Sequence, residues 1–289
     1  MIQQYRIAIN SAMRHNPKNL AEMGRYANRY LPDLRSDSQW RGIWKQYPAL
    51  KAEAKRLIKL SKSSTKQSNI YVDNRDYAVL VIGDLHAPIT HPNYLAHCVS
   101  IRDRFGCDFV VQIGDTLTNH RLSYHEDELD APSADEELEN SIVALREWGK
   151  EFPNVIVTIG NHDANIMRKA KTGSISSRWL KPFNEVLELP GWNFVSDAHI
   201  NVVRYRHNAG GTLQAVLKNS LAYGMPTVSG HIHTQSGVYR EGWLWGCLTG
   251  VGVDRGGYAL RYDKAHEPYQ HSCAVVNNGK EVFVMPMID

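Results

Sequence analysis

Three short apolar runs in this chain each lead into a glycine and then into a residue that can bind a metal ion. After the runs 77–82, 109–113 and 155–159, the sequence reads Gly83-Asp84-Leu85-His86, Gly114-Asp115 and Gly160-Asn161-His162-Asp163. A fourth element, Gly230-His231-Ile232-His233, follows Pro226-Thr227-Val228, and His207 stands alone before it. The candidate ligands are Asp84, His86, Asp115, Asn161, His207, His231 and His233. Carboxylate, amide and imidazole groups together suit a pair of divalent transition metals better than calcium or magnesium, which prefer oxygen ligands.

The apolar runs that precede these residues are rich in Val and Ile and short, which predicts buried strands. Between the second and third runs, Ser133-Ala134-Asp135-Glu136 is a capping box that predicts a helix as far as about Lys150. Strands that alternate with helices indicate an α/β architecture. Because side chains at the carboxyl ends of such strands leave the sheet and enter loops, we expect the three glycine-containing turns to converge on one crevice.

The later part of the chain continues this pattern. We expect a strand from Ile200 to Tyr205, a helix near Thr212 to Tyr223, and a terminal hairpin of 274–276 and 281–285 around Asn277-Asn278-Gly279. His207 is preferred as a ligand because it follows the carboxyl end of its expected strand. His199, at the start of that strand, is the alternative.

The amino-terminal residues differ in composition from the rest. Residues 1–68 hold 14 Lys and Arg against 4 Asp and Glu, a net +10, whereas residues 69–289 hold 19 against 26, a net −7. Helix-favouring residues and prolines at 17, 32 and 48 predict three or four short helices, and the polar stretch 61–68 predicts a linker. We therefore expect a basic helical domain at 1–68 and a second domain at 69–289. The basic surface would either bind a polyanion such as nucleic acid or be solvated.

Composition excludes several classes of protein. Hydrophobic residues are 43% and charged residues 22% of the 289, which is typical of a folded globular chain. Every apolar run is far shorter than the ~20 residues of a membrane-spanning helix, and the amino end lacks a signal-peptide pattern. The four cysteines form no C-x-x-C pair, which favours a reducing compartment. We expect a cytoplasmic protein that does not bind membranes, and its oligomeric state is left open.

The ordered motifs Asp84-x-His86, Gly114-Asp115, Gly160-Asn161-His162-Asp163, His207 and Gly230-His231-x-His233 resemble the signature of the calcineurin-like metallophosphoesterases. The resemblance covers roughly residues 77–286 and implies a β-sandwich flanked by helices, with two metals at one edge. It implies that Asp84, His86, Asp115 and His233 hold the first metal, and that Asp115, Asn161, His207 and His231 hold the second. His162 would approach the scissile phosphate, oriented by Asp163. Manganese is the preferred metal, with iron, zinc or nickel as alternatives.

The sequence departs from this family after Gly114-Asp115. Protein phosphatases of the family continue with a Val-Asp-Arg-Gly-type segment whose Arg grips phosphate, whereas this chain continues with Thr116-Leu117-Thr118-Asn119-His120. The difference weakens a phosphoprotein phosphatase interpretation. Asn119 and His120 are candidate substrate contacts, or else a solvated loop. Arg168 is a candidate contact for a polyanion, or else part of a solvated helix face.

The expected function is hydrolysis of a phosphate ester by a metal-bridging hydroxide, with no covalent enzyme intermediate. The basic amino-terminal part favours a phosphodiesterase or nuclease that acts on nucleic acid or nucleotides. The alternative enzyme is a phosphomonoesterase, for a small substrate or a phosphoprotein, with the helical domain as a lid or oligomerisation element. A non-catalytic binding scaffold is disfavoured because all seven ligand positions and His162 are filled.

Overall fold

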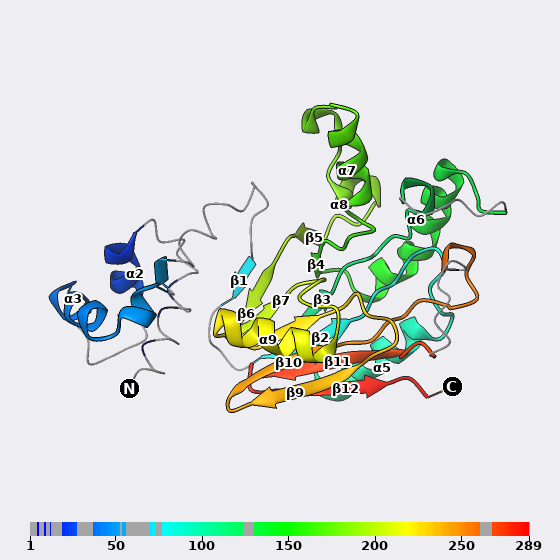
Figure 1. Cartoon of the computed structure of the whole chain (residues 1–289). Helices are drawn as coiled ribbons and strands as arrows, with labels where there is room; N and C mark the ends of the chain where they lie inside the picture. Colours follow the sequence, from blue (N-terminus) through cyan, green and yellow to red (C-terminus); the bar gives the residue numbers. More distant parts are fainter. Residues whose placement is uncertain are drawn as a thin grey trace. The chain divides into compact units, whose positions relative to one another are not determined.

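The computed structural model describes residues 5, 9, 12, 19–27, 37–52, 54, 55, 70–72, 77–123, 130–260 and 268–288. The chain forms two compact units, Met1–Tyr71 and Val72–Asp289, drawn in Figure 1. The polar stretch 61–68 lies outside the described residues, so the expected boundary near residue 68 stays a prediction.

The first unit contains the helices α2 (Leu20–Ala27) and α3 (Asp37–Gln46). Its buried apolar side chains include Met23, Trp40, Ile43 and Trp44, and the half-buried Tyr47 packs against them. The rings of Trp40 and Trp44 lie 4.9 Å apart. Trp40, Trp44 and Tyr47 therefore belong to a small aromatic core of this unit.

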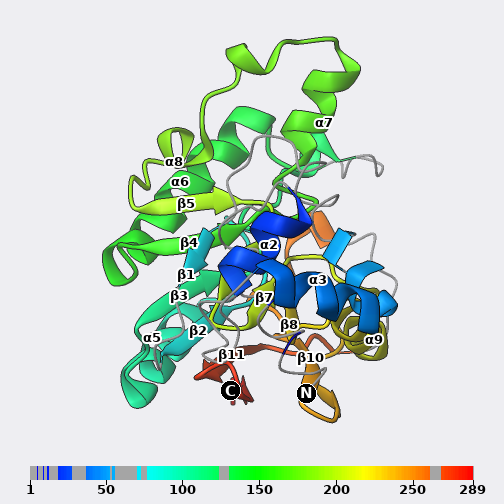
Figure 2. The same ribbon diagram turned by 90° about the vertical axis from the view of Figure 1, so that its left-hand side faces the viewer.

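The strands form two six-stranded sheets, whose layers can be followed in Figures 1 and 2. All of these strands belong to the second unit except β1 (Ile70–Val72), which spans the boundary between the two units. The first sheet has the order β12-β11-β2-β3-β4-β5. Its strands are β2 (Ala78–Ile82), β3 (Phe109–Gln112), β4 (Val155–Thr158), β5 (Trp192–Val195), β11 (Ser272–Asn277) and β12 (Glu281–Pro286). Strands β2 to β5 are parallel to one another, and β11 is antiparallel to both β2 and β12. The expected terminal hairpin is thus confirmed.

The second sheet has the order β1-β6-β7-β8-β10-β9. Its strands are β1 (Ile70–Val72), β6 (Ala198–Ile200), β7 (Val203–Tyr205), β8 (Thr227–Ser229), β9 (Gly237–Glu241) and β10 (Leu244–Leu248). Strands β7, β8 and β10 are parallel to one another, so their carboxyl ends lie at the same edge.

Helices flank the two sheets and bury their apolar faces against them. The helices α5 (Tyr94–Phe105) and α6 (Ala134–Glu151) contribute Tyr94, Leu145 and Trp148 to the core of the first sheet. On the second sheet, α9 (Leu213–Tyr223) packs Val216 near Leu248. The expected sandwich flanked by helices is therefore present.

Local sequence explains where the helices begin and end. Ser133 accepts a hydrogen bond from the Glu136 N–H at 3.3 Å, and Glu136 accepts one from the Ser133 N–H at 2.8 Å, which confirms the capping box of α6. The Thr212 hydroxyl accepts from the Ala215 N–H and caps α9. Gly224 ends α9 with φ of +65°, a conformation that glycine adopts without strain.

The prediction of one continuous strand from Ile200 to Tyr205 was wrong. Instead, β6 and β7 form a tight antiparallel hairpin in which Ile200 pairs with Val203. Asn201 occupies the turn with φ of +54°, a left-handed conformation that asparagine tolerates better than most residues. Because apolar residues stand on both sides of Asn201, the sequence pattern indicated a strand and the turn at this asparagine was not predicted.

The second unit also contains two short α-helices, α7 (Asn165–Thr172) and α8 (Phe183–Val186), and the 3-10 turn η3 (His120–Leu122). Two more 3-10 turns are η4 (Ser177–Trp179) and η5 (Tyr258–Leu260). Within the described part of the chain, every helix is too short or too polar to cross a membrane.

Candidate metal centre

The carboxyl ends of neighbouring parallel strands place the candidate ligands side by side. Asp84, Asp115 and Asn161 follow β2, β3 and β4, which are adjacent in the first sheet. His207 follows β7 and His231 follows β8, which are adjacent in the second sheet. The edge formed by these strand ends therefore collects ligands from both sheets, as the position of the motifs in the sequence predicts.

All seven candidate ligands lie in one cluster. The Nε2 atom of His207 is 3.1 Å from Asp115 Oδ2 and 3.0 Å from Asn161 Oδ1. The Nε2 atom of His86 is 3.8 Å from the same Asp115 oxygen. On the other side, Asp84 Oδ2 lies 3.5 Å from His233 Nε2.

Three sets of potential donor atoms in this cluster lie within 4.8 Å of one another, close enough to share a cation. The sets are Asp84, His86 and His233; His86, Asp115 and His162; and Asp115, His207 and His231. Asp115 belongs to two of them, so its two oxygens can face two different cations. The first set contains three of the four ligands expected for the first metal and lacks Asp115. The third set contains three of the four expected for the second metal and lacks Asn161, whose Oδ1 lies 3.0 Å from His207 Nε2.

The backbone of the cluster is strained at three ligand positions. His86, Asp115 and His231 have φ angles of 47°, 49° and 77°, in the left-handed region. Such a conformation in a residue other than glycine costs on the order of 1–3 kcal/mol and is common at functional sites. The conformations direct these side chains out of the tight turns and toward one another.

Buried polar atoms in the cluster fit a metal ion. Both ring nitrogens of His86 are buried and have no hydrogen-bond partner. An unpartnered buried donor or acceptor costs roughly 1–3 kcal/mol, and a metal ion bound to one ring nitrogen would remove that cost for the nitrogen. Neutral imidazole beside two carboxylates is a suitable donor set for a divalent transition metal. The residues present therefore fit the metal centre that the motifs predict.

Burial and neighbouring charges shift the pKa values of four groups in the cluster, namely His86, His231, His207 and Asp115. Burial and the neighbouring His162 lower the pKa of His86 well below its ordinary value, and burial and His207 lower the pKa of His231. Burial opposes the charge on His207, yet Asp115 and Asp84 raise its pKa to about 9. Burial also opposes the charge on Asp115, yet His207 and His162 hold the pKa of this carboxyl below its ordinary value. Without metal, a His207–Asp115 ion pair occupies the middle of the cluster.

His162 lies at the edge of this cluster and is held by a backbone carbonyl. Its Nδ1 is 2.7 Å from the Thr118 carbonyl oxygen, and its ring makes an edge contact with His86 at 4.7 Å. The backbone N–H of His162 also donates to Asp115 Oδ1 at 2.8 Å. The turn that carries His162 is therefore tied directly to the candidate bridging carboxylate.

Asp163 is placed differently from the expectation that it orients the His162 ring. Its buried carboxylate accepts hydrogen bonds from the Leu117 N–H at 3.0 Å and the Gly160 N–H at 2.9 Å. Burial and the charge of Asp115 raise the pKa of Asp163 to about 6. Asp163 thus joins two of the ligand-bearing turns, and the carbonyl of Thr118 orients His162.

The expected substrate contacts fall beside the cluster. Asn119 donates from Nδ2 to the His162 carbonyl at 3.0 Å, and His120 is buried in η3. Arg168 is exposed on α7 and donates to Asn165 Oδ1 at 3.5 Å. Asn119 and His120 are therefore part of the packed surroundings of His162, whereas Arg168 faces solvent.

Glu137 is a functional candidate that the motifs did not reveal. Its buried carboxylate accepts from the His120 N–H at 2.8 Å and from the Tyr258 hydroxyl at 2.7 Å. It stands four residues before Ser141 and eight before Leu145, both buried, so helical spacing is the signal that could have identified it. Glu137 therefore anchors the turn that lies beside His162.

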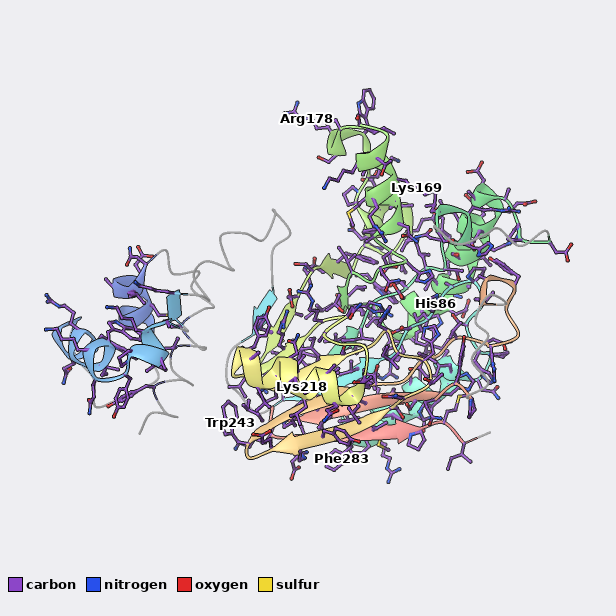
Figure 3. The ribbon with its side chains drawn as sticks, viewed as in Figure 1. His86, Lys169, Arg178, Lys218, Trp243 and Phe283 are labelled. Carbon is purple, nitrogen blue, oxygen red and sulfur yellow. The ribbon has the colours of Figure 1, made fainter. Side chains whose placement is uncertain are left out.

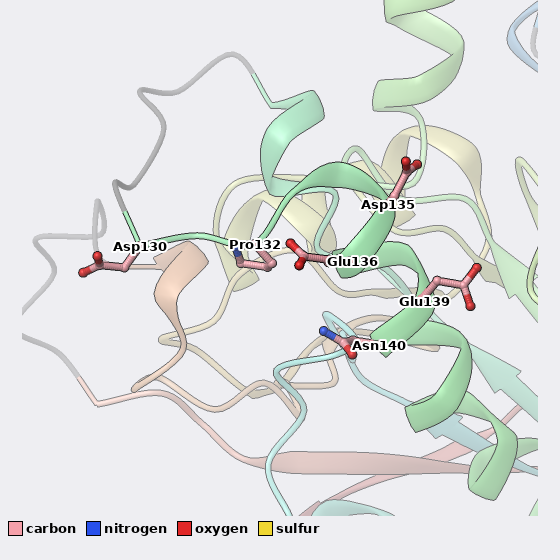
Figure 4. Close-up of a pocket in the computed structure, with 6 residues that line it drawn as sticks. All are labelled: Asp130, Pro132, Asp135, Glu136, Glu139 and Asn140. Atoms are coloured by element: carbon pink, nitrogen blue, oxygen red, sulfur yellow. The ribbon is translucent and has the colours of Figure 1, made fainter.

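An open depression of about 620 Å³ lies on the amino-terminal turns of α6, shown in Figure 4. Its lining includes four carboxylates, those of Asp130, Asp135, Glu136 and Glu139. Like charges repel, so this surface disfavours a phosphate ester. The metal cluster, and not this depression, is the candidate site for such a ligand.

Comparison with protein families identifies the fold and its chemistry. The model of the calcineurin-like phosphoesterases matches residues 77–235, which include all the clustered ligands. The chain belongs to the calcineurin-like phosphoesterase family. This phosphoesterase is therefore a metal-dependent hydrolase of phosphoesters, and the clustered groups are its candidate metal ligands.

Solved structures resemble this phosphoesterase at low sequence identity. A predicted phosphoesterase from Streptococcus pneumoniae is 12% identical with a TM-score of 0.33, and covers 74% of this chain and 99% of its own. Vacuolar Protein Sorting 29 from Cryptosporidium parvum is 13% identical with a TM-score of 0.38 over 74% and 99% of the two chains. A single mutant of Vps29 from Entamoeba histolytica is 14% identical with a TM-score of 0.33 over 73% and 99%. No curated protein matches the sequence.

Proposed function

We propose that this phosphoesterase binds two divalent cations and hydrolyses phosphodiesters, with nucleic acid or nucleotides as the substrate class. The first cation is assigned to Asp84, His86, Asp115 and His233, and the second to Asp115, Asn161, His207 and His231. The observation that carries the proposal is the convergence of these groups, from turns of both sheets, around a buried imidazole with two unpartnered nitrogens.

Cations bound there would lower the pKa of water and neutralise the oxygens of a phosphoryl group. The protein itself supplies orientation and a proton. Because the Thr118 carbonyl is only an acceptor, the hydrogen bond at 2.7 Å requires a proton on His162 Nδ1. The Nε2 atom is then the position at which His162 gains or loses its second proton, and protonated His162 can donate it to the leaving oxygen. General acid catalysis of this kind contributes typically about 10²- to 10⁴-fold.

Two features of the sequence support a polyanionic substrate. Residues 1–68 carry a net charge of +10, which attracts phosphates, and the segment after Asp115 lacks the Arg that protein phosphatases of the family use. We propose manganese as the metal, with iron, zinc or nickel as alternatives, because mixed nitrogen and oxygen donors accept each of them.

The test compares three substrates with and without manganese: a generic aryl phosphodiester, an aryl phosphomonoester and DNA. We expect hydrolysis of the diester and of DNA, abolished by EDTA. Hydrolysis of the monoester alone would contradict the proposed substrate class. Metal analysis of the purified protein then identifies the native ion.

Two variants test the roles of the histidines. His162→Ala is expected to retain manganese and lose roughly 10²- to 10⁴-fold in turnover. His207→Ala is expected to lose manganese affinity, whereas His199→Ala, the matched control on β6, is expected to keep both affinity and turnover. Full activity of His162→Ala, or metal loss in His199→Ala alone, would overturn these assignments.

We also propose a cytoplasmic location. All four cysteines, Cys98, Cys107, Cys247 and Cys273, are free thiols, as expected of a reducing compartment. A disulfide found in protein isolated from its source after rapid thiol blocking would argue against this location.

A further inference from the structure

A basic arm projects from the metal centre. We define the arm as residues 164–182, which contain α7 and η4. It carries five cationic residues and no Asp or Glu, although the second domain as a whole is acidic. The cations are Arg168, Lys169, Lys171, Arg178 and Lys181, and all five are exposed. Residues 171–179 form a run in which every residue is exposed.

The tip of this arm also exposes large apolar side chains. Trp179 is 82% exposed and Ile175 is 53% exposed, so both leave most of their surface in water. An exposed tryptophan among cations and without nearby carboxylates in the sequence is typical of surfaces that bind single-stranded nucleic acid, in which bases stack on aromatic rings and phosphates contact cations.

The arm begins at the candidate active site. Its first residue follows Asp163 directly, and α7, with eight residues, extends about 12 Å at 1.5 Å per residue. Figures 1 and 2 show α7 standing out from the sheets, and Figure 3 places Lys169 and Arg178 on this projection, with His86 below it. A strand bound along the arm would therefore lead toward the metal cluster.

The two helices that contact η3, α6 and α7, differ in charge, and this difference favours one direction of approach for a polyanion. The turn η3 lies against both α6 and α7. The α6 side carries the four carboxylates of the depression in Figure 4, whereas the α7 side carries the cations of the arm. A polyanion near the site is therefore repelled from α6 and attracted to α7.

We propose that the arm binds single-stranded nucleic acid, with its lysines and arginines on the phosphates and Trp179 stacked on an unpaired base. This inference rests on the proposed function and specifies its substrate as single-stranded. Lys171 and Arg178 are the cations chosen for the test because both lie in the exposed run 171–179 that also carries Trp179. Lys181 is not used, because it is paired with Glu185 at 3.2 Å. A duplex hides the faces of its bases, so stacking on Trp179 favours a single strand.

The test measures binding of a fluorescein-labelled dT20 oligonucleotide to the full-length protein in EDTA, by anisotropy at several KCl concentrations. Trp179→Ala is expected to weaken binding roughly 5- to 100-fold at every salt concentration. The double variant Lys171→Gln/Arg178→Gln is expected to weaken it and to reduce the slope of log K against log [KCl] by about 1.4, which is ~0.7 for each phosphate that the variant no longer neutralises. Matched controls are Tyr239→Ala, a 50% exposed aromatic on β9, and Lys218→Gln on α9.

Unchanged dT20 affinity in both arm variants would overturn the inference. So would self-association of the protein that Trp179→Ala abolishes while dT20 binding is unaltered, because the arm would then be a protein interface. Hydrolysis of the aryl phosphodiester with manganese separates this result from the proposed function. That activity is expected to be equal in the wild type and the arm variants, and its absence from the wild type would refute the proposed function alone.

Discussion

Replacement of Glu137 tests whether the turn beside His162 is held by one buried carboxylate. Glu137 is 4% exposed and accepts two hydrogen bonds, from the His120 N–H and the Tyr258 hydroxyl. Hydrogen bonds to a charged group contribute about 1.5–3 kcal/mol each. Glu137→Ala removes both and leaves the His120 N–H buried without an acceptor, so we expect a loss of about 3–6 kcal/mol in the free energy of unfolding.

Urea unfolding of the metal-free protein measures this loss, and thermal unfolding should show a fall in Tm of roughly 6–24 °C for a domain of this size. Glu139→Ala is the matched control, because Glu139 is exposed on the same helix. It is expected to change stability by less than about 0.5 kcal/mol. Tyr258→Phe removes only one of the two hydrogen bonds to Glu137. Its loss in unfolding free energy is expected to lie between those of Glu137→Ala and Glu139→Ala.

Activity gives a second measure of the same contact. Because η3 lies beside Asn119, which contacts His162, Glu137→Ala is expected to lower kcat more than it changes KM. Equal unfolding free energies for Glu137→Ala and Glu139→Ala would show that the carboxylate does not hold this turn.

Three other predictions concern the metal cluster and the second sheet. A Cβ on Gly160 would collide with the Asp115 carboxylate, so Gly160→Ala is expected to weaken manganese binding at least tenfold by titration calorimetry, whereas Gly211→Ala, with open space around it, should bind normally. Arg204→Ala removes a 3% exposed guanidinium that bonds Asp197 at 2.8 Å and Asn219 at 3.0 Å, and is expected to cost about 3–5 kcal/mol in urea unfolding. Arg206→Ala removes a partner of the same Asp197 whose side chain is 44% exposed and should cost less than about 1 kcal/mol, and equal losses would contradict the burial argument. The His207 pKa of about 9 lies above its ordinary value, so the imidazole is protonated at pH 7 and must lose its proton to bind a metal. Manganese affinity should therefore rise between pH 7 and pH 9 with proton release, and a flat profile would refute the assigned pKa.

The clustering of the candidate ligands could be predicted from the sequence because the information is local. Asp84, Asp115 and Asn161 follow recognisable Val- and Ile-rich strands, and parallel strands bring their carboxyl ends to one edge without any knowledge of side-chain packing. The preference for His207 over His199 used the same reasoning, and the structure places His207 within the cluster.

What the sequence missed depends on contacts across the fold. The carbonyl of Thr118 orients His162, and every residue has a carbonyl, so no residue type marks it. Asp163 has the same side chain whether it faces an imidazole or two backbone N–H groups. Glu137 stands beside Asp135 and Glu136 in an acidic first turn, in which the helix dipole explains all three equally well. Only the folded structure separates the buried carboxylate from its exposed neighbours.

The left-handed backbone at His86, Asp115 and His231 has a consequence for directed evolution of this enzyme. Glycine adopts this conformation freely, so Gly at His86, whose ring nitrogens have no hydrogen-bond partner, would relieve local strain while removing a donor. A library screened for heat tolerance in chelator, with turnover left unmeasured, would be enriched in such variants. Rounds of selection for robustness should therefore alternate with rounds that demand catalysis, or the most stable descendants will be inert.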